Sequence, residues 1–283
     1  MRTRRAGLSG ARLVLQPHLE CARRPGHDGA MRSAFLPILS RLLAGVCCLV
    51  SLPSDAAEEL PPESTRAMLA QTATELAECT AALGRKPDSV GLYSRRGDCH
   101  LFLGHFAAAV GDFEKMIALD PAQDAPHWRL GIAYYFAGDF GKAARQFEKY
   151  HQHDGGDREN GIWKFLAQVR GETLAKARAE MLVYPRFDRE PFPALYEMFA
   201  GTRTTEAVFA EIERKGLQRD ARVMFFANYY AGLNEALLGH RERALDLTRR
   251  AAASAWGQTA EGGPAYMWQV ARLHAARLAA GAE

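Results

Sequence analysis

The sequence predicts an all-α protein in which helical hairpins stack into a superhelical solenoid that ends in a C-terminal capping helix. Two adjacent segments carry the same small and aromatic residues at an offset of 34 positions. A third copy of this spacing recurs near the C-terminus. The last helix, expected over residues 264–280, begins with a Pro after two glycines and has an apolar face suited to covering the open end of the array.

The repeat is most regular between residues 90 and 157. The first copy contains Tyr93, Gly97, Gly104, Ala109, Phe113 and Pro121, with Arg96 and His100 at two places that differ from the pattern. The second contains Leu130, Gly131, Tyr134, Gly138, Ala143 and Phe147. This is the spacing of the tetratricopeptide repeat (TPR), in which small residues let two helices approach closely and larger ones fill the gap between them. We therefore expect clear repeats at 90–123, 124–157 and 225–258.

The segments around these repeats also predict helices. Residues 59–83 form an amphipathic helix that leads into the first full repeat, and 159–216 form degenerate helical pairs. The exception is 184–193, where three prolines forbid a continuous helix and predict an extended loop. This loop carries four charged residues that either contact a partner or form an ion pair within a long connection, namely Arg186, Asp188, Arg189 and Glu190.

The N-terminal 56 residues have the composition of an export signal. From Met31 a basic start is followed by an apolar stretch and then by small residues, which predicts a signal peptide over 31–56 and a mature domain over 57–283. Residues 1–30 are then a non-native upstream extension. A retained membrane anchor is the alternative, but residues 42–52 are shorter than a spanning helix needs. Lipid attachment at Cys47 or Cys48, and with it outer-membrane anchoring, is disfavoured because no small residue precedes either cysteine. We expect a periplasmic location.

The charge of the chain is unevenly distributed. Residues 1–56 hold eight Arg against three acidic residues, whereas the remainder holds 28 basic and 30 acidic residues. A near-neutral folded portion without a basic stripe does not suit nucleic-acid phosphates, so nucleic acid is not an expected partner.

The sequence contains no recognisable catalytic motif. Neither a phosphate-binding glycine loop, a nucleophile elbow nor a zinc-protease motif is present, which favours a non-enzyme without cofactor or small-molecule substrate. The group His151, His153 and Asp154 could ligate a metal, but it lies at a helix end beside two glycines, where solvated polar residues are common. A hydrolase with an unfamiliar site and a purely structural envelope component remain the alternatives.

Two longer segments resemble a known family. They read GIAYYFAGDFGKAARQFEKYHQHD followed by IWKFLAQ, and NYYAGLNEALLGHRERALDLTRRAA followed by YMWQVARLHA. These are similar to the NlpI-type periplasmic TPR adaptor lipoproteins over roughly residues 65–280. The resemblance implies a homodimeric scaffold that brings peptidoglycan hydrolases together with one another and with a protease that degrades them. The missing lipid-attachment signal departs from that family.

The first helix of each TPR hairpin lines the concave face of an array, so its inward positions predict a binding groove. These positions are apolar and aromatic in this chain, which is typical of a surface that binds a protein or peptide. The predicted groove residues are Phe102, Trp128, Ile132, Tyr135, Phe136, Phe226 and Tyr229. The alternative is that neighbouring helices, the Pro-rich loop or the C-terminal helix already cover them.

Cys79 and Cys99 lie at equal distances on either side of the turn between two expected antiparallel helices. Their side chains can therefore face each other, and in an oxidising compartment they could form a disulfide. Because Cys79 occupies the place of Phe113 and Phe147 in the later copies, two buried unpaired thiols are the alternative.

Overall fold

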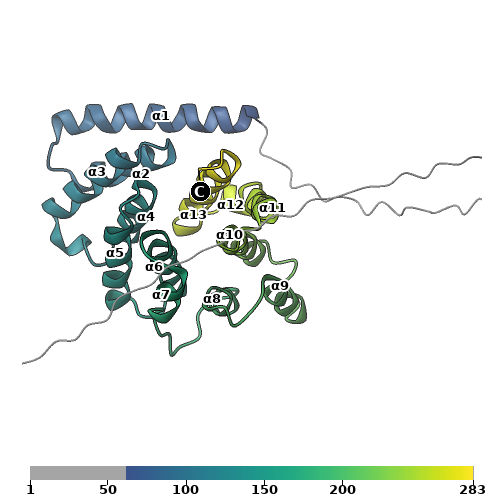
Figure 1. Ribbon diagram of the computed structural model, residues 1–283. Helices are drawn as coiled ribbons and strands as arrows, with labels where there is room; N and C mark the ends of the chain where they lie inside the picture. Colours follow the sequence, from purple (N-terminus) through teal and green to yellow (C-terminus); the bar gives the residue numbers. More distant parts are fainter. Residues whose placement is uncertain (1–61, 283) are drawn as a thin grey trace, which may run out of the picture. The chain divides into compact units, whose positions relative to one another are not determined.

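A computed structural model describes residues 62–282, and this part of the chain confirms the predicted all-α class. Consecutive helices pack as antiparallel pairs, as expected of an array of helical hairpins (Figure 1). The helices are α1 (Pro62–Arg85), α2 (Val90–Phe102), α3 (Phe106–Leu119), the short 3-10 helix η1 (Pro121–Gln123), α4 (Trp128–Ala137), α5 (Phe140–His153), α6 (Arg158–Gly171), α7 (Leu174–Ala179), α8 (Phe192–Ala200), α9 (Thr205–Arg214), α10 (Ala221–Leu237), α11 (Arg241–Ala252), α12 (Ala255–Thr259) and α13 (Gly263–Ala279). The predicted upstream extension, signal peptide and lipid-attachment cysteines lie outside the described residues.

The three clear repeats correspond to the helix pairs α2 and α3, α4 and α5, and α10 and α11. Gly104, Gly138 and Gly239 stand between the two helices of these pairs with φ between 81° and 83°, a backbone conformation that L side chains rarely adopt. Within the second pair, Gly131 faces the ring of Phe147, which is fully buried. The hairpin therefore closes on a glycine because no side chain fits between the helix backbone and this ring.

Replacing Gly131 with Ala is expected to lower the free energy of unfolding by about 1–3 kcal/mol, because the added Cβ would lie 2.6 Å from the Phe147 ring. Gly111→Ala is the matched control: this glycine lies inside α3, and a Cβ there would meet no atom within 4 Å. The control should instead gain about 0.5–1 kcal/mol from its higher helix propensity. Urea unfolding of both variants measures the difference, and equal effects would contradict this account of the hairpin.

The segment after the second repeat departs from the prediction in one place. We expected residues 184–193 to form an extended loop, but α8 begins at Phe192. Pro191 occupies the N-cap position and Pro193 lies in the first turn, where a helix has no partner for the missing N–H group. The prolines therefore start this helix instead of preventing it.

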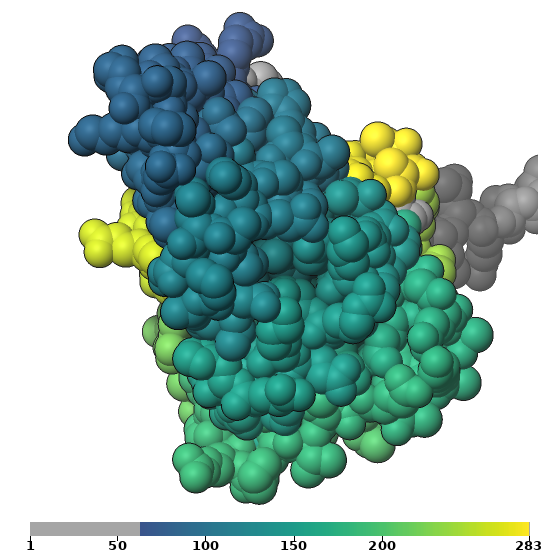
Figure 2. Space-filling view, turned by 90° about the vertical axis from the view of Figure 1, so that its left-hand side faces the viewer, coloured from purple at the N-terminus to yellow at the C-terminus, as the bar shows by residue number. Residues whose placement is uncertain are grey.

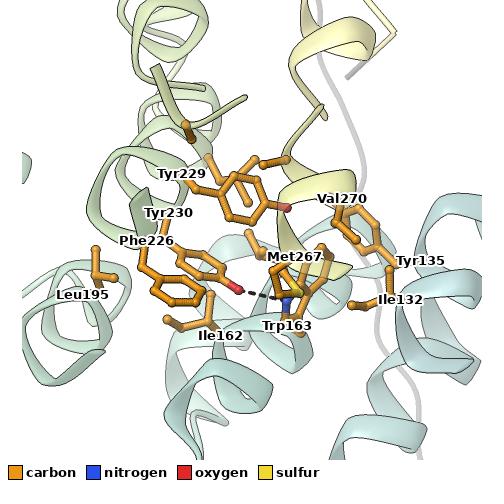
Figure 3. Packing of buried hydrophobic residues seen from close by; sticks show 14 of the residues in the cluster. Ile132, Tyr135, Ile162, Trp163, Leu195, Phe226, Tyr229, Tyr230, Met267 and Val270 are labelled. Carbon is orange, nitrogen blue, oxygen red and sulfur yellow. Dashed lines mark hydrogen bonds between the residues drawn. The ribbon is translucent and has the colours of Figure 1, made fainter. Parts of the chain in front are cut away.

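The C-terminal helix α13 does more than cover the end of the array. It contacts α11 and α12, the two helices that precede it, and also returns to α2, where the Arg272 guanidinium donates a hydrogen bond of 2.7 Å to the Phe102 carbonyl. In Figure 3, Met267 and Val270 on α13 lie between Tyr229 of α10 and Tyr135 of α4. The helix thus packs on the last hairpin, as expected of a capping helix, and also covers the inner side chains of the array.

Buried aromatic side chains dominate the core around α13. Trp163, Tyr229, Tyr230 and Phe225 are each at most 1% exposed. On the face shown in Figure 2, side chains of the N-terminal half of the described chain cover most of the surface, and C-terminal residues emerge at its edges. None of the helices in residues 62–282 is long and apolar enough to cross a membrane.

Cys79 and Cys99 are buried, and the structure holds both as free thiols. Burial raises the pKa of the Cys99 thiol to about 12, so this thiol stays protonated and unreactive at neutral pH. The structure therefore agrees with the second interpretation from the sequence, in which the two thiols are buried and not bonded to each other. A chain comprising residues 57–283, unfolded without reductant, should show two reactive thiols, and both should react slowly while the protein is folded. Finding no reactive thiol after unfolding would restore the disulfide.

Candidate partner-binding pocket

Most of the predicted groove residues lie in the core. Ile132 and Tyr229 are 0% exposed, and Tyr135, Phe136 and Phe226 are at most 6% exposed. Helix α13 covers them: the Tyr229 hydroxyl lies 2.7 Å from His274 Nδ1, and the Tyr135 and His274 rings are 5.7 Å apart. Phe102 is half-buried, with its ring 5.0 Å from that of Tyr266. The predicted groove is therefore not open in the structure. Helix α13 covers it, which agrees with the alternative interpretation from the sequence.

A pocket of about 340 Å³ remains open beside this covered face. The starts of four helices converge on it, namely α4, α6, α10 and α13, together with the loop before α8. The side chains and backbone that line it belong to Trp128, Asp157, Glu159, Asn160, Trp163, Arg189, Arg222, Phe226, Gly263, Pro264 and Met267. Trp128 and Phe226 are thus the two predicted groove residues that reach the pocket.

One wall of the pocket is an ion network centred on Arg189. Its guanidinium lies 3.2 Å from Asp157 Oδ1, 2.5 Å from Glu159 Oε2 and 3.3 Å from Asp188 Oδ1. It also lies over the ring of Phe192, 4.2 Å from the ring centroid. Because Asp157 and Glu159 are 30 or more residues from Arg189 in sequence, the network ties the loop before α8 to the start of α6.

Glu159 is the most enclosed member of the network. The Tyr230 hydroxyl donates a hydrogen bond of 2.6 Å to Glu159 Oε1. The same hydroxyl oxygen accepts a hydrogen bond of 3.1 Å from Trp163 Nε1, which Figure 3 shows as a dashed line. Asp157 is the N-cap of α6 and accepts from the Glu159 backbone N–H. Burial raises the pKa of Glu159 to about 7 and also raises the pKa of Asp157.

The rest of the lining is largely apolar. Trp128, at the start of α4, is half-buried, and its ring packs edge-on against that of Tyr266 at 4.9 Å. Phe226, Pro264 and Met267 complete this surface. At the rim, Arg222 is exposed and makes no hydrogen bond or ion pair with any described residue. The pocket therefore combines an apolar floor, a wall of paired charges and an unpaired guanidinium.

The sequence identified part of this pocket. It singled out Arg189 and Asp188 in a loop with an internal ion pair, and the structure contains this pair; Glu190 similarly pairs with Lys215 at 2.6 Å. The part played by Asp157, Glu159 and Arg222 was missed. One signal in the sequence could have indicated Glu159: it is a charged residue at the start of a helix whose following residues are almost all buried. Within residues 62–282, no group of His, Cys, Asp or Glu is arranged to hold a metal ion, and His151 instead packs against Tyr184.

The raised pKa of Glu159 predicts a pH dependence of stability. A carboxyl whose pKa is higher in the folded than in the unfolded protein stabilises the fold when protonated. Its contribution is complete below about pH 4.5 and is lost as the pH rises through about 7. As the pH rises between these limits, we expect the free energy of unfolding of Glu159→Gln to increase by about 3 kcal/mol relative to that of the wild type.

Urea unfolding of both proteins across this pH range measures the effect. Burial also moves the pKa of Asp98 to about 6 and that of His127 to about 4, but these groups titrate in both proteins and cancel in the difference. A stability difference that stays constant with pH would contradict the prediction.

The stacked hairpins define a helical-repeat protein whose structure is consistent with TPR repeats. No protein-family model matches the chain. Over 88 residues, 31% of this chain, it is 32% identical to the protein SGT1 homolog of Bos taurus, and over 79 residues it is 34% identical to that of Homo sapiens. These matches cover 26% and 22% of the two relatives, so the chain spans about a quarter of their length. The similarity is distant and partial.

Proposed function

We propose that this chain is an adaptor that binds protein partners and is not an enzyme. The observation that carries the proposal is the pocket beside the covered face of the helical array. An apolar floor next to fixed polar groups is typical of sites that bind a side chain of a partner. The partial similarity to the SGT1 homologs and the TPR-like hairpins support a binding role of this kind.

The proposal extends to location and partners. By its resemblance to the NlpI-type adaptors, the chain is exported through a signal peptide over 31–56, works in the cell envelope as a homodimer, and binds peptidoglycan hydrolases and a protease. Mass spectrometry of the mature protein tests the export step: its N-terminus should lie near Ala57. A peptide from residues 1–30 in the mature protein would contradict it, and acyl chains on Cys47 or Cys48 would indicate a lipid anchor.

Affinity purification from an envelope extract tests the adaptor role. We expect cell-wall hydrolases and a protease to be retained by the wild type and to bind again when purified. The matched variant is Trp128→Ala, which should retain less of the same proteins because it removes an aromatic face of the pocket. A wild type that retains no protein would favour a structural envelope component. Hydrolysis of peptidoglycan by the purified chain alone would favour the hydrolase alternative.

A further inference from the structure

The hydrogen-bonding groups that remain free in the pocket determine which ligand it can bind. Its volume of about 340 Å³ suits one large side chain, and Trp128, Phe226 and Met267 offer that side chain an apolar floor. The sign of charge that can accompany this side chain depends on the polar groups that have no partner within the protein.

The carboxylates that line the pocket are already satisfied. Asp157 Oδ1 accepts from the Glu159 backbone and from Arg189, and Oδ2 accepts from Asn160 Nδ2. Glu159 Oε1 accepts from Tyr230, and Oε2 accepts from Arg189. Each of these four oxygens thus has a donor, and a basic ligand would have to displace a buried hydrogen bond to reach them.

The groups left over are donors. Arg222 has no acceptor among the described residues, and Arg219, three positions earlier, is likewise exposed and unpaired there. Helix α13 starts at the pocket with Gly263, and its N-cap Gly262 offers no side-chain acceptor to the first turn. This turn also contains no acidic residue that would compensate the positive end of the helix dipole. An anionic group is therefore the complementary one at this rim.

Building on the proposed function, we infer that the pocket binds an internal acidic segment of a partner protein. A large apolar side chain of this segment enters between Trp128, Phe226 and Met267, and a neighbouring Asp or Glu side chain lies against Arg222 and the start of α13. The Arg189 network acts as a rigid wall that positions the segment and offers no free acceptor to a basic residue.

Selection of random peptides displayed between fixed flanking sequences, on the whole chain, tests this inference. The expected result is enrichment of peptides in which a large apolar residue lies within two positions of Asp or Glu. Enrichment of basic peptides, of apolar peptides without charge preference, or of none would overturn the inference. A second library, in which the peptides have free C-termini, gives a further check. Binding that depends only on the terminal carboxylate would also overturn the inference. The retention of envelope proteins tests the adaptor role in a separate experiment. A failure of the adaptor role can therefore be distinguished from a failure of the acidic-segment inference.

A synthetic peptide from the enriched set, with blocked termini, then locates the charge contact by fluorescence polarisation. Arg222→Glu should weaken its binding by about tenfold or more, Arg222→Lys should keep most of the affinity, and Asp or Glu replaced by Asn or Gln in the peptide should weaken binding similarly. The matched control is Arg66→Ala, an exposed arginine on α1 that does not line the pocket. Equal effects at Arg222 and Arg66, or tighter binding by Arg222→Glu, would overturn the inference.

Discussion

Replacing Arg189 with Ala is expected to lower the free energy of unfolding by about 3–5 kcal/mol at pH 8, because the variant leaves buried carboxylates without their partner. Glu159 is 7% exposed and the Asp157 side chain is 19% exposed, so water replaces the guanidinium only in part at these groups. The variant also loses the contact between Arg189 and the Phe192 ring. We expect the loop before α8 to detach from the start of α6 first, since the network is what joins them.

The matched control for this variant is Arg214→Ala. Arg214 also pairs with a carboxylate, that of Glu211 at 2.7 Å, but its side chain is 69% exposed. Because water and salt screen such a surface pair, its removal should change the free energy of unfolding very little. Urea unfolding at pH 8 compares the two variants. A loss at Arg189 no larger than the loss at Arg214 would show that the network contributes little to the fold.

The helical repeats could be predicted from the sequence because their signals are local and recur. Gly131 and Phe147 lie 16 positions apart in the same hairpin, and the same spacing joins Gly97 to Phe113. Each pair indicates that two neighbouring helices approach closely. This contact depends on only a few residues that are near one another in the sequence. The start of α8 was missed for the opposite reason. The prolines at 191 and 193 break a helix at interior positions but are tolerated in its first turn, and the sequence alone did not fix where that turn lies.

The candidate pocket was only partly predictable because it depends on contacts between distant segments. Arg189 and Glu159 meet across 30 residues, and neither residue carries a local pattern that names the other. Trp128 meets Tyr266 of α13 across an even longer separation. Aromatic residues at the inward positions of a repeat are equally consistent with a free groove and with a face that another helix covers. The position of α13, which decides between them, is a property of the whole array.

The covered face leads to opposite expectations for two residues that the sequence treated alike. Tyr229 is 0% exposed, and its hydroxyl lies 2.7 Å from His274 Nδ1 in the core. Tyr229→Ala removes a large buried ring and a hydrogen-bonding partner of His274, so we expect a loss of about 3–5 kcal/mol in the free energy of unfolding. Partner affinity, measured below the unfolding transition, should change little, because Tyr229 does not line the pocket.

Trp128→Ala should show the reverse balance. Its ring is half-buried at the pocket, so truncation removes less core packing but takes away a face that a partner can contact. We expect a smaller loss of stability than for Tyr229→Ala, together with a loss of about 2 kcal/mol or more in partner binding. Urea unfolding and binding of the same purified partner give both quantities for both variants. If Tyr229→Ala weakens binding as much as Trp128→Ala at temperatures where both proteins are folded, the partner contacts the inner face and α13 must move to admit it.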